Sequence, residues 1–296
     1  MENQLTISPV VAGCMKWGRW GAAFSTDQYK AITEACLAAD ITTFDHADIY
    51  GDYSTEAEFG EMLRPSPSLR QKMQIITKCG IKMPVASRPG FHIKSYDTSR
   101  EYILHCAELS LQNLHTDYLD VLLIHRPSPL MHPEEIASAF NRLKEQGKVL
   151  HFGVSNFTPS QTALLHKYFP VEINQLEVSL LHMEPLHNGQ LDYCLQEKII
   201  PMAWGPLGSG RLFIPGEKDE QATRIRKTAS ALAEKYKVSL ESILLAFLHR
   251  HPAGIIPVLG TSKPERLLEA MQTSSLRLEA EEWFMLWEAS AGHEVP

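Results

Sequence analysis

Short apolar runs rich in β-branched residues recur along the chain and alternate with longer segments of helical periodicity. Most of the short runs are continuously apolar, which is typical of parallel strands that are buried on both faces. Their alternation with helical segments indicates an α/β fold. The pattern predicts strands at residues 8–15, 41–48, 73–79, 118–125, 149–156, 171–177, 199–204 and 254–260.

Helical segments lie between these runs. The segment 98–114 carries apolar residues at the spacing of one helix face. Another helix is predicted to begin after Thr158, where Gln161 completes a capping box. A third is predicted to start at Pro133 and to stop near Gly147, since glycine commonly ends a helix.

The strand–helix units fill residues 1–296 and leave no low-complexity linker, so we predict a single domain. The alternative is an open doubly wound sheet. That fold usually carries a Gly-x-Gly-x-x-Gly turn after its first strand when it binds dinucleotides, and this chain has no such turn. Eight units without a leftover sheet favour a (β/α)8 TIM barrel.

Polar side chains end several of the apolar runs. In (β/α)8 barrels the chemistry takes place at the carboxyl ends of the strands. A lysine at the end of one apolar strand and a histidine at the end of the next are not what packing alone would select. The polar residues at these ends are Asp45, Lys78, His125, Ser155, Asn156 and Gln175.

Tyr50 follows Asp45 by five residues and suggests a phenol used as an acid. A free tyrosine has a pKa near ~10 and donates its proton poorly at neutral pH. Lys78, held by Asp45 on the neighbouring strand, would supply a cation that lowers the pKa of Tyr50. His125 would orient a substrate oxygen toward Tyr50. The four groups suit an oxygen that gains negative charge and then a proton, as in carbonyl reduction by a hydride from elsewhere.

Each of these residues also has a structural explanation. Asp45 could cap a helix, Tyr50 could pack at a strand end, and Lys78 could form a structural ion pair. His125 could satisfy loop carbonyls. Their occurrence together on three successive strands favours catalysis.

Several motifs in register resemble those of the aldo-keto reductase family, over essentially the whole chain. The resemblance implies a short, bacterial-type member: an NAD(P)H-dependent (β/α)8 reductase whose tetrad is Asp45, Tyr50, Lys78 and His125, with Tyr50 as the proton donor. The motifs are FDHADIYG (44–51), IITK (75–78), LLIHRP (122–127), GVSNF (153–157), INQLE (173–177), AWGPLGSG (203–210) and GTSKPER (260–266).

The later motifs offer groups suited to a nicotinamide cofactor. Ser155, Asn156 and Gln175 present hydroxyl and amide groups for the carboxamide. The resemblance places Trp204 under the nicotinamide ring, and the following glycines would let backbone approach the pyrophosphate. The cofactor-binding residues are expected to be Ser155, Asn156, Gln175, Trp204, Gly205, Pro206, Leu207, Gly208, Gly210, Gly260, Thr261, Ser262, Lys263, Arg266 and Glu269.

The last motif bears on which nicotinamide cofactor is used. Ser262 and Glu265 are predicted to form a capping box, and the N-terminus of the helix that follows would attract phosphate. Lys263 and Arg266 could clasp an adenosine 2′-phosphate, which favours NADPH and leaves NADH possible. The alternative is a solvated basic turn.

Apolar residues after the first strand are candidates for the substrate pocket. Met15, Trp17 and Trp20 could form its walls beside His125, or they could be packing at its rim. His46 stands where many family members have a small residue, so the rim of the pocket is expected to differ here.

Composition narrows the possible partners. The 296 residues carry a formal net charge of −7, and no run of Lys or Arg forms a stripe for nucleic acid. No apolar run approaches the roughly 20 residues that a membrane span requires. The N-terminal segment lacks the features of a signal peptide, and the five cysteines are scattered, so we expect a cytoplasmic protein with reduced thiols. We expect a small-molecule carbonyl substrate and no metal, with the oligomeric state open and a monomer plausible.

Two other functions are considered. One is a redox-sensing regulatory protein that holds the nucleotide and turns over slowly; the intact tetrad argues against it. The other is a metal-dependent barrel hydrolase that uses His46, Asp48 and His125. It would lack the His-x-His expected on an early strand and would leave Lys78 without a role. The substrate and the direction of reaction are not determined by the sequence.

Overall fold

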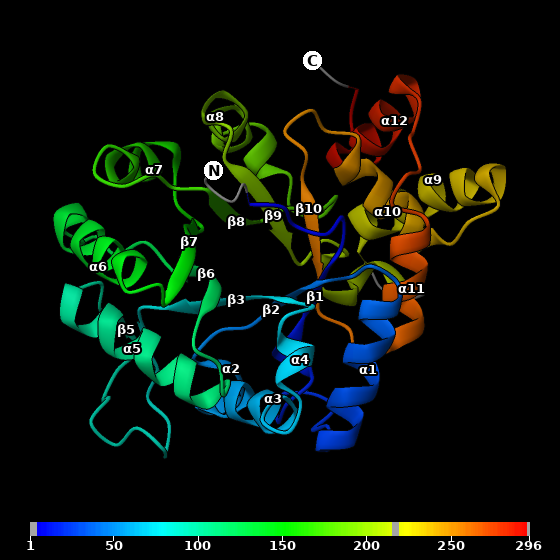
Figure 1. Ribbon diagram of the computed structural model, residues 1–296. Helices are drawn as coiled ribbons and strands as arrows, with labels where there is room; N and C mark the ends of the chain where they lie inside the picture. The colour runs from blue at the N-terminus through cyan, green and yellow to red at the C-terminus, as the bar shows by residue number, and fades with distance from the viewer. Residues whose placement is uncertain (1–4, 215–218, 295–296) are drawn as a thin grey trace.

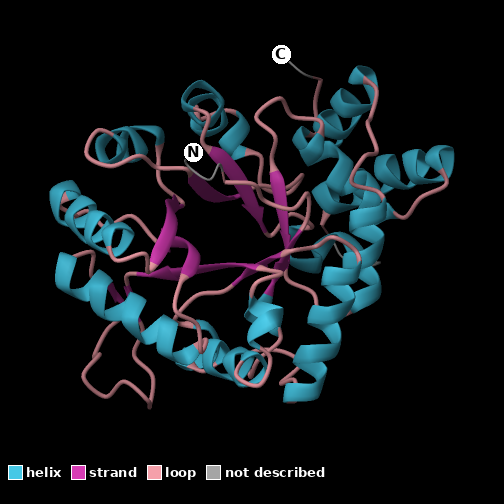
Figure 2. Ribbon diagram, viewed as in Figure 1, coloured by secondary structure: helices cyan, strands magenta, loops and turns pink. Residues whose placement is uncertain are grey.

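The computed structural model describes residues 5–214 and 219–294. Residues 1–4, the start of the segment inspected for a signal peptide, lie outside the described residues. Eight parallel strands close into a barrel in the order β1-β10-β9-β8-β7-β6-β3-β2 (Figures 1 and 2). These strands are β1 (Val11–Gly13), β2 (Thr43–Asp45), β3 (Gln74–Cys79), β6 (Leu119–Ile124), β7 (Val149–Ser155), β8 (Ile173–Glu177), β9 (Ile200–Trp204) and β10 (Ile256–Leu259).

Helices surround the barrel on its outside (Figure 2). A short antiparallel hairpin, β4 (Ile81–Lys82) with β5 (Ser95–Tyr96), follows β3 and forms a separate two-stranded sheet. The α-helices are α1 (Thr26–Ala38), α2 (Tyr50–Tyr53), α3 (Thr55–Leu63), α4 (Pro67–Arg70), α5 (Arg100–Asn113), α6 (Pro133–Glu145), α7 (Pro159–His166), α8 (Gln190–Glu197), α9 (Glu220–Tyr236), α10 (Leu240–His249), α11 (Pro264–Gln272) and α12 (Ala280–Ala291). The 3-10 helices are η1 (Cys14–Lys16), η2 (Glu184–Leu186) and η3 (Gly208–Phe213).

The predicted barrel is confirmed, and each of its strands lies within a predicted run. The continuous apolar runs reflect burial on two sides, as in β6, where all six residues are buried. Alternate residues of the strands fill the barrel interior, among them Val11, Ile76, Val121 and Met202. The others pack against the helices.

Two of the predicted helix starts can be compared at their caps. Thr158 and Gln161 form the expected capping box at the start of α7. The box predicted between Ser262 and Glu265 is wrong, because α11 begins one residue later, with Lys263 as an N-cap that makes no side-chain bond. Lys263 precedes Pro264, which disfavours helical backbone at Lys263, so the first helical residue is the proline itself.

Within the described ranges, no helix is long and apolar enough to cross a membrane.

Candidate active site

Lys78 enters the barrel interior because side chains alternate along β3. Ile76 packs inside the barrel, and Thr77 points outward, where its hydroxyl donates to Glu56 of α3 at 2.6 Å. Lys78 therefore points inward again, and its side chain is 1% exposed. Asp45 pairs in register with Ile76 on the adjacent strand, so its carboxylate lies close to the Lys78 ammonium.

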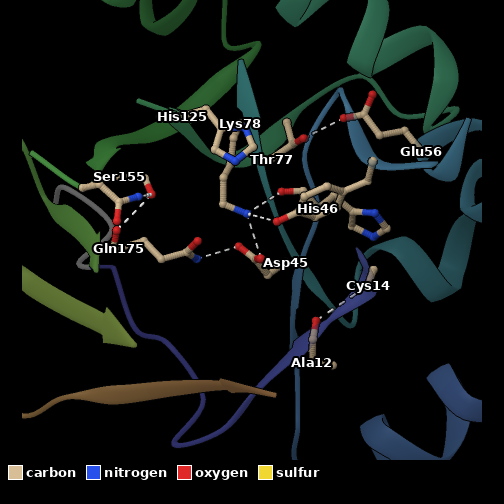
Figure 3. A network of polar contacts seen from close by, with 12 residues as sticks. Ala12, Cys14, Asp45, His46, Glu56, Thr77, Lys78, His125, Ser155 and Gln175 are labelled. Carbon is tan, nitrogen blue, oxygen red and sulfur yellow. Dashed lines mark hydrogen bonds and ion pairs between the residues drawn. The ribbon is translucent and has the colours of Figure 1, made fainter. Parts of the chain in front are cut away.

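The Lys78 ammonium has three acceptors, one for each of its N–H groups. It donates to Asp45 Oδ2 at 2.7 Å, to the His46 carbonyl at 2.8 Å and to Tyr50 Oη at 3.1 Å. Figure 3 shows the ammonium between Asp45 and the His46 backbone. The structure thus brings together the cation, the carboxylate and the phenol that the sequence placed at one site.

The acidity of Tyr50 differs from the expectation. Burial raises the pKa of Tyr50 above its ordinary value, and the positive charge of Lys78 opposes this rise without reversing it. The prediction that Lys78 lowers the pKa of Tyr50 below its ordinary value is therefore wrong. Desolvation of a phenolate in an enclosed pocket outweighs a single ammonium that is already paired with Asp45. Tyr50 consequently holds its proton at neutral pH.

Lys78 keeps its proton as well. Burial lowers the pKa of Lys78, but the charge of Asp45 and the hydrogen bonds to Asp45 and Tyr50 outweigh burial and raise the pKa above its ordinary value. Lys78 is therefore a fixed ammonium that can stabilise a phenolate.

His125 lies at the end of β6, with its ring centroid 6.1 Å from that of Tyr50. Burial, followed by the charges of Lys78, Arg126 and Lys94, lowers the pKa of His125 well below its ordinary value. Its Nδ1 is buried and has no hydrogen-bond partner in the described part of the chain. A neutral imidazole can donate one hydrogen bond, so His125 can bind a carbonyl oxygen without acting as the acid.

A chain of hydrogen bonds links the expected nicotinamide residues to the tetrad. Trp204 Nε1 donates to Asn156 Oδ1 at 3.0 Å, and Asn156 Nδ2 donates to Ser155 Oγ at 2.7 Å. Ser155 Oγ donates to the Gln175 carbonyl at 2.9 Å, and Gln175 Nε2 donates to Asp45 Oδ1 at 2.8 Å (Figure 3). The sequence did not foresee the contact between Gln175 and Asp45, because it joins strands on opposite sides of the barrel.

The loop after β9 supplies left-handed backbone. Ser209 and Gly210 in η3 have φ of 53° and 88°, and Gly208 has φ of 61°. The positive φ of Gly208 favours glycine, and a Cβ there would also press on the Leu181 side chain, 2.5 Å from its Cδ1. A Cβ at Gly210 or Gly260 would meet nothing within 4 Å, which leaves open space beside both backbones.

The N-terminus of α11 fits a phosphate group. Its first N–H groups have no side-chain cap, and such groups bind anions. Lys263 and Arg266 are exposed beside it, and within the described residues neither forms an ion pair. These features fit the adenosine phosphate of a dinucleotide.

The candidate pocket residues divide into two groups. The Trp20 ring lies 6.2 Å from that of Tyr50, and its Nε1 donates to Asp52 at 3.0 Å. Met15 is 36% exposed. Trp17 is 0% exposed, so the expectation that it could line the pocket is wrong.

Trp17 is instead a core residue between η1 and the helices. Its ring packs against Phe44 and Phe59, and its Nε1 donates to the Thr261 carbonyl at 2.8 Å. The turn of η1 directs Trp17 inward and Met15 outward. Sequence alone does not show which side of a single 3-10 turn faces the core.

The metal-hydrolase hypothesis does not fit the geometry. The His46 ring lies on the far side of its backbone from Lys78, packed at 4.6 Å against Phe59 (Figure 3). Burial and then the charge of Lys78 lower the pKa of His46 to about 3. No group of three His, Cys, Asp or Glu side chains among the described residues could hold a metal ion. His46 and His125 therefore do not form one site.

Arg126 is not among the site residues predicted from the sequence, yet it lies beside them. Its guanidinium carbon lies 5.6 Å from the centroid of the Trp204 ring, beside His125. The signal available in the sequence was an arginine directly after the histidine that ends an apolar strand.

Comparison with known proteins places these motifs in context. The profile of the aldo/keto reductase family matches residues 9–291. The chain is 41% identical to the oxidoreductase YdhF of Escherichia coli, with 100% of both chains covered, and 40% identical to the uncharacterized oxidoreductase YcsN of Bacillus subtilis, with 100% of this chain and 98% of the relative covered. It is 39% identical to a 6-dehydroglucose reductase of Agrobacterium fabrum, over 100% of this chain and 98% of that protein.

Solved structures agree at the level of the fold. An aldo/keto reductase from Klebsiella pneumoniae, solved with NADP and acetate, superposes with a TM-score of 0.77 at 23% identity, covering 98% of this chain and 93% of that one. A thermostable aldo-keto reductase solved with the inhibitor epalrestat gives a TM-score of 0.78 at 24% identity, covering 96% and 95%.

Proposed function

The chain belongs to the aldo/keto reductase family of oxidoreductases, and from this membership and the site geometry we propose that it reduces an aldehyde or ketone to an alcohol, with Tyr50 as the proton donor. The observation that carries the proposal is the buried contact of 3.1 Å between the Lys78 ammonium and the Tyr50 hydroxyl. A nicotinamide cofactor bound at the later motifs would supply the hydride.

The four residues of the tetrad have separate roles in this proposal. The neutral His125 ring donates a hydrogen bond to the substrate oxygen and directs it toward Tyr50. As that oxygen gains negative charge, the proton on Tyr50 Oη moves to it. Lys78 then stabilises the phenolate left behind, and Asp45 holds Lys78 in place. General acid catalysis of this kind typically contributes about 10²- to 10⁴-fold to the rate.

NADPH is the proposed cofactor, with NADH as a weaker alternative. Ser155, Asn156 and Gln175 would hold the carboxamide, Trp204 would lie under the nicotinamide, and the loop after β9 would contact the pyrophosphate. Lys263 and Arg266 support the preference, because two exposed cations beside the start of α11 suit a 2′-phosphate. The described cysteines are all free and buried, in keeping with a cytoplasmic protein.

The test is a panel of aldehydes and ketones assayed with NADPH and with NADH. It should include a sugar aldehyde, because one relative is named a 6-dehydroglucose reductase. We expect NADPH-dependent reduction of at least one aldehyde by the wild type, and the loss of that reduction in Tyr50→Phe. Nicotinamide fluorescence should show that the variant still binds NADPH. Undiminished reduction by Tyr50→Phe would contradict the assignment of the proton donor.

A further inference from the structure

Arg126 lies between the chemical centre and the residues expected to hold the nicotinamide. It directly follows His125 of the tetrad, and its guanidinium carbon lies 5.6 Å from the Trp204 ring centroid. The charge of Arg126 also acts on His125. Arg126, which is half-buried, therefore lies beside the chemical centre, within reach of a substrate that His125 would bind.

The donors of Arg126 are largely unused. A guanidinium has five N–H groups and no acceptor. Arg126 Nη1 donates a long hydrogen bond of 3.4 Å to the His125 carbonyl. Across the described ranges Arg126 forms no ion pair, although its side chain is partly buried. The charge of Glu177 acts to raise the pKa of Arg126, but the two side chains are too far apart to form an ion pair.

Lys94 is a second cation on this side of the barrel. It directly precedes β5, which pairs with β4 just after the end of β3 that carries Lys78. Its side chain is exposed, and its charge acts on His125 together with that of Arg126. It too lacks an ion pair in the part of the chain that the structure describes. The carboxylate of Asp45 cannot balance these charges, since its two oxygens bind Lys78 and Gln175.

We propose that Arg126 and Lys94 bind oxygen atoms of the substrate beyond its carbonyl, and that the natural substrate is an oxygen-rich, hydroxylated or acidic aldehyde or ketone. This inference rests on the proposed function. Both side chains offer donors only, so their ligand atoms must be acceptors. The planar fork of Arg126 matches two oxygens of one carboxylate or two on adjacent carbons.

A contact with Trp204 alone does not account for this arrangement. A cation over an indole at a solvent-accessible site contributes only weakly to stability. It satisfies none of the N–H groups in the plane of the guanidinium. Those groups remain available to a ligand.

Three four-carbon aldehydes test the proposal. Erythrose carries hydroxyl groups, succinic semialdehyde carries a carboxylate, and butanal carries neither. The measured quantity is kcat/KM for each oxygenated aldehyde divided by kcat/KM for butanal. We expect this ratio to be well above one in the wild type and to fall about 10- to 100-fold in Arg126→Met, the range for loss of charged hydrogen bonds. Lys94→Met should lower it less, because Lys94 is exposed.

Matched variants identify the kind of oxygen and the specificity of the effect. Arg126→Lys should restore most of the ratio for succinic semialdehyde if a carboxylate is bound, and little for erythrose if paired hydroxyls need the fork. Lys72→Met removes an exposed cation before the amino end of β3 and should leave both ratios unchanged. Thermal unfolding checks that each variant is folded, and nicotinamide fluorescence checks that Arg126→Met binds NADPH as the wild type does.

The outcomes separate this inference from the function on which it rests. If a folded Arg126→Met variant loses activity equally with butanal and with both oxygenated aldehydes, or loses NADPH affinity to the same extent, the inference is overturned and the reductase function stands. A wild type that shows no NADPH-dependent reduction of any aldehyde would overturn both.

Discussion

Tyr50 is a phenol whose ionisation is opposed by burial and favoured by one ammonium. Its spacing from Asp45, and the lysine and histidine on the next two strands, could be read from the sequence. The net direction of its pKa could not be, since it depends on how closely the residues around Tyr50 exclude water. The raised pKa keeps the proton on Oη at neutral pH, and the Lys78 ammonium limits the rise because it stabilises the phenolate that forms when the proton leaves.

The amide of Gln175 was predicted to bind cofactor, and it also donates to Asp45 Oδ1. Gln175→Met would remove that donor from a buried carboxylate while keeping the side-chain size. We therefore expect the cofactor-free protein to lose about 1–3 kcal/mol of stability, measured by urea unfolding. Gln196→Met, at an exposed glutamine, serves as the control. Equal stability of Gln175→Met and wild type without cofactor would show that Gln175 does not support Asp45.

His46 should make the stability depend on pH. Its pKa in the folded protein is lowered to about 3, mainly by burial. In the unfolded chain the same ring binds a proton below pH ~6.5. The free energy of unfolding should therefore be unaffected by His46 above that pH and should decrease as the pH falls toward 3, because only the unfolded state gains the proton. His46→Leu should reduce the slope of unfolding free energy between these values by about 1.4 kcal/mol per pH unit.

The control for His46 is His92→Leu, which changes an exposed ring and should leave the slope unchanged. His249 has a pKa lowered to about 4 and contributes a slope of the same sign in every variant, so only differences between variants are compared. An unchanged slope in His46→Leu would mean that His46 accepts a proton readily in the folded state.

Among the elements, the barrel strands could be predicted because two-sided burial produces continuous apolar runs. The exact first and last residues of each strand could not be predicted, because a strand ends where its pairing with neighbouring strands ends, and composition does not show this. The hairpin β4–β5 was not foreseen, because strands of two residues have no periodicity to detect. The burial of Trp17 could not be predicted either, because it depends on a contact with Thr261, which is far away in the sequence.

The contact of α3 with the end of α5 allows no extra atom. A Cβ at Gly60 would lie 1.9 Å from the backbone oxygen of Asn113, which cannot move without shifting α5. Gly60→Ala should therefore destabilise the protein by about 1–3 kcal/mol despite the better helix propensity of alanine. Gly90→Ala is the control, since a Cβ there meets nothing within 4 Å. Thermal and urea unfolding should separate the two variants, and comparable stability would contradict this packing.

For the whole molecule, closure of the barrel brings the site together. Gln175 and Asp45 are 130 positions apart and are joined by a hydrogen bond of 2.8 Å. The sequence showed that polar residues end the strands, and the barrel rule placed those ends at one face. Which side chains touch inside the barrel depends on register and rotamer. For this reason the Asp45–Gln175 bond and the position of Arg126 required the structure.

The most direct test of the central claim is a single turnover. Wild type and Tyr50→Phe, each carrying one equivalent of bound NADPH, are mixed with excess reducible aldehyde, and the near-ultraviolet absorbance of the reduced nicotinamide is followed. The wild type should oxidise its NADPH completely and continue when more is added, whereas Tyr50→Phe should retain NADPH unoxidised over the same time. Oxidation by Tyr50→Phe at the wild-type rate would contradict the role of Tyr50, and a wild type that keeps its NADPH reduced would indicate a nucleotide-binding regulatory protein instead.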